Sequence, residues 1–170
     1  MTLALVWLLL LWGPRGSGQQ LPYKVNGRKV WEVQPSGTTT VRTSLGKTPL
    51  VVAIHTWQMQ PQGARPAGPY AYPACIGAAC SITEWIRVRL GGKSLWVGPY
   101  QIAGLANIHY LAIGGSPARL ELILVGDDAA ESYDAHLIFN NEHVIERVLY
   151  AGIDLSHPFE VSHFYYSDIN

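Results

Sequence analysis

The pattern of hydrophobic and polar residues indicates short β-strands along most of the chain. Apolar and polar side chains alternate with a period of two in 82–90, 119–125 and 133–139, as they do in half-buried strands. Turn residues separate the strand-like segments, and Asn26-Gly27 and Gly91-Gly92 are two-residue sequences typical of β-hairpins. Helical periodicity is almost absent. The pattern therefore predicts about ten short strands.

These strands predict an all-β fold: a single-domain sandwich or barrel built from consecutive antiparallel hairpins. No segment resembles another closely enough to indicate a propeller or a solenoid. Residues 60–73 interrupt the pattern, because their four prolines and two glycines prevent both a helix and a sheet ladder. We therefore predict a long Pro/Gly-rich loop there, inside one domain that covers residues 19–170.

Residues 3–12 form an uninterrupted apolar run near the start of the chain. This run is too short to cross a bilayer, which takes about 20 residues, but it fits the hydrophobic region of a signal peptide. The small residues that follow, ending at Gly18, suit a signal peptidase. We therefore predict a signal peptide over 1–18 and a secreted or periplasmic protein, although Met1 and Thr2 supply no basic charge. No comparable run follows, so we expect no membrane span in the mature chain.

The only two cysteines, Cys75 and Cys80, lie close together in the sequence. In an oxidising compartment such a pair is expected to form a disulfide. A metal site would need further ligands, and a thioredoxin-type redox pair would need the spacing Cys-x-x-Cys. We therefore predict a structural disulfide that shapes a local loop.

Basic and acidic residues are equal in number but unevenly distributed. Between residues 19 and 119 the only acids are Glu32 and Glu84, whereas from residue 120 onward the only base is Arg147. Two interpretations follow: strands of opposite charge pair and neutralise each other, or one face of the protein is basic and attracts an anionic partner. Nucleic acid is not an expected partner of an exported protein.

The hairpin that turns at Gly91-Gly92 predicts a candidate binding surface. A two-residue turn there places Arg89 opposite Ser94 and Arg87 opposite Trp96. Aliphatic residues then occupy the core face, and the opposite face carries the predicted binding residues: Trp85, Arg87, Arg89 and Trp96. Such a face could hold carboxylates or phosphates and stack on sugar rings. Alternatively, the indoles face a second layer or are covered by the arginine stems.

Six histidines raise the question of a metal site, but none lie in a His-x-His or His-Glu-x-x-His pattern. A two-residue turn at Asn140-Asn141 would place His136 and His143 diagonally on one face, with Asp134 opposite Arg147. Zinc needs three or four converging ligands, so we predict neither a metal nor a cofactor. A group of acids lacks the spacing of an EF-hand and is interpreted as a solvated loop: Asp127, Asp128, Glu131 and Asp134.

No motif specifies a reaction, and the Gly-x-Ser-x-Gly elbow of many hydrolases is missing. The leading hypothesis is a non-catalytic binding or interaction module of the cell envelope or extracellular medium. Its partner would be an envelope polysaccharide, an anionic surface or another exported protein. The alternative is a small secreted hydrolase or metal-dependent enzyme, whose histidines and acids converge only in the fold.

Overall fold

The computed structural model describes residues 20–25, 27–59, 80–126, 132–152 and 154–166. The predicted signal peptide, the loop at 60–73, Cys75 and the acids Asp127, Asp128 and Glu131 lie outside these residues. The disulfide and the signal peptide therefore remain predictions.

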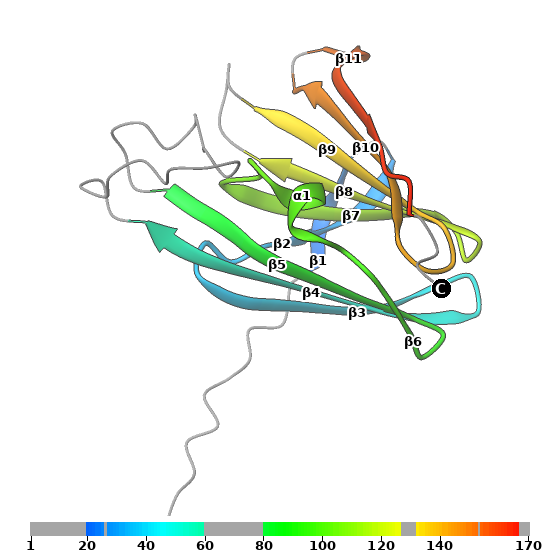
Figure 1. Cartoon of the computed structure of the whole chain (residues 1–170). Coiled ribbons are helices and arrows are strands. Elements are labelled where there is room, and N and C mark those ends of the chain that lie inside the picture. Colours follow the sequence, from blue (N-terminus) through cyan, green and yellow to red (C-terminus); the bar gives the residue numbers. More distant parts are fainter. Residues whose placement is uncertain (1–19, 26, 60–79, 127–131, 153, 167–170) are drawn as a thin grey trace, which may run out of the picture.

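The larger of two antiparallel sheets contains strands from both ends of the chain, which Figure 1 colours from blue to red. The strand order is β1-β2-β7-β8-β9-β10-β11, so β1 and β11 form its two edges. Its strands are β1 (Gln20–Val25), β2 (Arg28–Glu32), β7 (Ile108–Ser116), β8 (Arg119–Gly126), β9 (Tyr133–Phe139), β10 (Val144–Ala151) and β11 (Asp154–His163).

The smaller sheet is built from the strands between β2 and β7, in the order β3-β4-β5-β6. Its strands are β3 (Gly37–Leu45), β4 (Thr48–Met59), β5 (Cys80–Leu90) and β6 (Lys93–Leu95). A single short helix among the described residues, α1 (Pro99–Ile102), leads from this sheet back to the larger one. The all-β prediction is confirmed, and because both sheets end in edge strands, the described strands form a sandwich and not a closed barrel.

Two-residue turns close the predicted hairpins where glycine permits them. Arg28 pairs with Val25, as the first predicted hairpin requires, and Lys93 pairs with Leu90 across Gly91 and Gly92. Both glycines of the second turn have positive φ angles, +60° and +89°. A turn of this kind needs positive φ at its central positions, which explains why glycine occupies them.

The core lies between the two sheets, where alternate residues of each strand meet. In β4 and β5, Val52, Ile54 and Ile86 point inward and are almost fully buried. Leu111 and Leu124 of the larger sheet belong to the same apolar cluster. Because alternate positions along β4 and β5 are buried, the positions between them form the outer face of the smaller sheet.

The last hairpin differs from its prediction, because its loop has four residues, 140–143, and not two. The side-chain oxygen of Asn140 accepts hydrogen bonds from the backbone N–H groups of Glu142 and His143, at 2.8 and 2.9 Å. These hydrogen bonds satisfy two backbone donors of the longer loop, and the longer loop shifts the register of β10. An irregularity between Val144 and Glu146 shifts the register by one residue more, so Asp134 lies opposite Tyr150 and the predicted pairing with Arg147 is wrong.

No helix within the described ranges has the length and apolar character needed to cross a membrane.

Candidate anion-binding face

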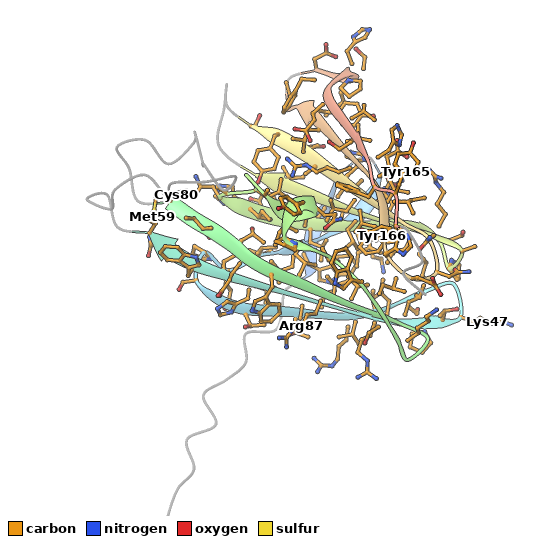
Figure 2. The ribbon with its side chains drawn as sticks, viewed as in Figure 1. Lys47, Met59, Cys80, Arg87, Tyr165 and Tyr166 are labelled. Carbon is orange, nitrogen blue, oxygen red and sulfur yellow. The ribbon has the colours of Figure 1, made fainter. Side chains whose placement is uncertain are left out.

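Three of the four predicted binding residues lie together on the outer face of the smaller sheet. Trp85, Arg87 and Arg89 alternate along β5 with the buried Ile86 and Val88. The two arginines are exposed and the indole is partly exposed. Figure 2 shows Arg87 on the side of β5 that is turned away from the larger sheet. Strand alternation therefore places these three side chains as predicted.

The fourth residue, Trp96, lies elsewhere, because β6 ends at Leu95. The backbone N–H of Trp96 donates to the carbonyl of Glu142 at 2.7 Å, and its carbonyl accepts from Val144 at 3.2 Å. After Leu95 the main chain therefore stops pairing with β5 and bonds to the larger sheet instead. The predicted pairing of Trp96 with Arg87 is therefore wrong. The indole is 52% exposed and makes an edge contact with Tyr166, with the ring centroids 5.4 Å apart.

Two further residues, Arg42 and His55, lie on the outer face with the three from β5. Arg42 of β3 and Arg89 of β5 both pair with Val51 of β4, so the two arginines flank one strand. His55 pairs with Trp85 in the same way. Sequence alternation within one hairpin could not identify either residue, because each comes from a strand outside that hairpin.

The indole of Trp85 is enclosed by two neighbours. The ring of His55 lies nearly parallel to it, with centroids 5.1 Å apart and planes 11° apart. The guanidinium carbon of Arg87 lies 4.3 Å from the indole centroid, in a cation–π contact. Because both neighbours lie against the ring, Trp85 orients the charge of Arg87 and offers little surface for stacking on a sugar.

His55 is held by a hydroxyl and a carboxylate. Its Nδ1 is 2.8 Å from the hydroxyl of Thr38, and its Nε2 is 3.3 Å from a carboxylate oxygen of Glu84. Glu84 reaches this position from a bulge, since Thr56 pairs with Thr83 and His55 with Trp85. These contacts fix the imidazole and, through it, the indole on which Arg87 lies.

The two interpretations of the uneven charge distribution apply to different parts of the molecule. Several bases of the first half pair with acids of the second half, which is mutual neutralisation. These pairs are Arg28–Glu121, Lys93–Glu142 and Arg119–Glu146, with nitrogen–oxygen distances of 2.6, 3.1 and 3.4 Å. In contrast, Arg42, Arg87 and Arg89 form no ion pair with any carboxylate of the described residues. The outer face of the smaller sheet therefore carries uncompensated positive charge.

A second polar cluster, which the sequence did not reveal, lies on the face of the larger sheet opposite the core. Glu121 of β8 binds Arg28 of β2 at 2.6 Å and His136 of β9 at 2.7 Å. The hydrogen bond from His136 lowers the pKa of Glu121 most, burial opposes it, and Arg28 lowers it further, to about 2. The carboxylate is thus ionised and committed to two partners.

The described residues offer no ready site for a metal ion. No three side chains of His, Cys, Asp or Glu gather among them in a way that could hold an ion. The histidines instead contact individual partners, such as Glu84 for His55 and Glu121 for His136.

The chain matches no family model, no curated protein and no solved structure.

Proposed function

We propose that the protein is an exported, non-catalytic binding module that binds an acidic polysaccharide through the outer face of the smaller sheet. The observation that carries this proposal is the group formed by Arg42, Arg87 and Arg89, which are exposed and lack carboxylate partners among the described residues. Guanidinium groups bind carboxylates and sulfates well because they donate parallel hydrogen bonds.

The spacing of these arginines supports an extended ligand. Neighbouring strands lie about 4.8 Å apart, so Arg42 and Arg89, with one strand between them, have Cα atoms separated by about 10 Å. Arg87 and Arg89 lie about 7 Å apart along β5. Charges distributed over one face of a sheet suit a polymer with repeated anionic groups better than a single small anion.

The enclosed indole of Trp85 supports a mainly electrostatic mode of binding. Stacking on a sugar would require an open ring face, and His55 and Arg87 already lie against this ring. Affinity should therefore depend strongly on salt, because counterions are released when arginines neutralise a polyanion.

The test compares binding to alginate, which carries carboxylates, with binding to dextran, which is uncharged. We expect the wild-type protein to bind alginate at about 50 mM NaCl and to bind it about tenfold more weakly near 300 mM NaCl. It should not bind dextran. The triple variant R42Q/R87Q/R89Q should bind at least about tenfold more weakly and show a smaller salt slope. Isothermal titration calorimetry measures each affinity.

Matched variants separate the face from general charge effects. R119Q removes one exposed arginine elsewhere and should leave alginate binding nearly unchanged. W85A should weaken binding by releasing Arg87, whereas W96A should not, because Trp96 lies outside the face. Equal losses in R119Q and in the triple variant would contradict the proposal. So would binding to dextran, or binding to an acidic protein with no binding to alginate.

The exported location is a separate part of the proposal, supported by the apolar run at 3–12 and the small residues up to Gly18. Expression of the full chain in a secreting host should release a protein whose N-terminal sequence starts at Gln19. Retention of the uncleaved chain inside the cell would refute this part and leave the binding face untouched.

A further inference from the structure

Asp134 is a largely buried residue whose carboxyl group has no hydrogen-bonding partner among the described residues. Only 5% of the residue is exposed, and no donor from the described part of the chain reaches its side chain. The other strongly buried charge, Arg147, shows the usual solution, because it donates to backbone carbonyls and pairs with Glu160. An ionisable group is rarely buried without such partners, because desolvation disfavours its charged form.

Aromatic side chains flank Asp134 on its own face of the larger sheet. The register sets Asp134 opposite Val125 of β8 on one side and Tyr150 of β10 on the other. Tyr110 of β7 lies opposite Val125 in the same row. Directly opposite residues of adjacent strands point to the same face, so the carboxyl group has a tyrosine on each side, one of them beyond a valine. Both tyrosines are partly exposed.

The described charged groups on this face do not supply a hydrogen-bonding partner for Asp134. His136 lies two residues along β9 and shares its face, but its Nδ1 is bonded to Glu121, which also holds Arg28. Glu32, opposite Tyr110 on β2, is another acid. Burial raises the pKa of Asp134, and the nearby His136 lowers it. An added positive charge beside Asp134 would therefore stabilise the ionised form of its carboxyl group.

We propose that Asp134, Tyr110 and Tyr150 form a site for a small organic cation, with an ammonium group as its charged part. The carboxylate would bind the ammonium directly, and the two phenol rings would contact its alkyl groups and attract its charge. This site is separate from the arginine face and does not depend on the proposed function.

A metal ion fits these residues less well than an ammonium group. Calcium and magnesium take six or more oxygen ligands, most of them from carboxylates, carbonyls or water. Asp134 belongs to no group of three potential ligands among the described residues. Aromatic neighbours, in contrast, are the usual companions of quaternary and alkyl ammonium groups.

The proposal predicts opposite effects of Asp134→Asn on stability and binding. An ionised carboxyl group buried without a partner destabilises the folded state, so the neutral amide should raise the Tm at neutral pH by a few degrees. The same substitution should remove the cation site. This combination distinguishes a binding residue from a structural one, whose loss would lower the Tm.

The experiment titrates the mature protein with tetramethylammonium chloride near pH 7.5 and follows amide and side-chain NMR shifts. We expect shifts centred on Asp134 and Tyr150 with a Kd in the millimolar range, corresponding to about 4 kcal/mol or less. Affinity should fall as the pH drops toward 4, because protonation of Asp134 removes its charge. Sodium chloride at equal concentration is the control for ionic strength.

Three variants complete the test. D134N should weaken binding at least tenfold, and Y150L should weaken it several-fold by removing a ring. D154N, which changes an exposed carboxylate on β11, should bind like the wild type. The proposal is overturned if no shifts centre on Asp134 at about 50 mM ligand, well above a millimolar Kd. Equal binding by D134N, or a lower Tm for D134N, would overturn it as well.

Discussion

Arg147 on β10 donates a hydrogen bond from Nη1 to the backbone carbonyl of Ala103, 2.6 Å away at the end of α1. The same nitrogen lies 3.4 Å from the carbonyls of Tyr100 and Gln101, and Nε lies 3.3 Å from Glu160 on β11. One buried guanidinium therefore joins the connecting helix to the two last strands of the larger sheet.

Replacing Arg147 with methionine should strongly destabilise the fold. Methionine keeps much of the volume, but it leaves the backbone carbonyls at α1 without their donor and the carboxylate of Glu160 without its cationic partner. We expect a loss of about 3 kcal/mol in the free energy of unfolding, measured by urea denaturation. R119M, which breaks an exposed ion pair with Glu146, should cost less than about 1 kcal/mol. Similar losses in both variants would contradict the assigned role of Arg147.

Glu121 should make the protein sensitive to acid. Its pKa lies near 2 in the folded protein, below the ordinary value of 4.5, so its stabilising contribution is complete above about pH 4.5 and is lost as the pH falls toward 2. E121Q should cost about 2 kcal/mol at neutral pH, and the difference from wild type should vanish near pH 2. Because Asp134 is present in both proteins, the difference isolates Glu121. E142Q, in an exposed pair with Lys93, should show almost no such dependence.

Gly114 should control the pairing of Arg28 with Glu121. A Cβ atom at position 114 would lie 2.4 Å from the guanidinium carbon of Arg28, which crosses the glycine to reach the carboxylate. Gly114→Ala should displace this flexible side chain at little cost to the fold. The pKa of Glu121 should then rise but stay below 4.5, because His136, its strongest partner, remains. NMR titration of the carboxyl carbon should give the same pKa for G114A and R28Q; an unchanged pKa in G114A would contradict this prediction.

The predicted disulfide between Cys75 and Cys80 can be tested directly. Titration of the denatured, unreduced protein with a thiol reagent should find no thiol, and reduction should reveal two. Closing so short a loop should contribute about 2 kcal/mol at most, so C75S/C80S should still fold. Two thiols before reduction would refute the bond.

Hairpins with two-residue turns could be predicted because glycine and asparagine determine their geometry locally. The turn at Gly91 and Gly92 sets Arg89 opposite Ser94, as predicted. This register and the alternation along β5 correctly predicted the side of the sheet on which Arg87 lies. The β9–β10 register could not be predicted in this way. There, the side-chain oxygen of Asn140 accepts hydrogen bonds from the backbone N–H groups of Glu142 and His143, which stabilises a longer loop than the Asn-Asn pair suggests.

The candidate face was only partly predictable because it combines separate hairpins. Period-two alternation identified Trp85, Arg87 and Arg89, which share one strand. Arg42 and His55 join them through cross-strand pairing over β4, which depends on how the hairpins pack. The predicted position of Trp96 was wrong because the chain bonds to the larger sheet after β6 ends. No local residue pattern indicates where β6 ends.

The junction at Trp96 has a consequence for how this protein could diverge. Its two bonds to Glu142 and Val144 use only main-chain groups, so any residue except proline could form both of them. The indole itself, half open to solvent, can therefore be exchanged during evolution while the chain keeps its path between the sheets. Position 96 is therefore a place where a new side chain could change what this surface recognises while the main-chain path stays the same.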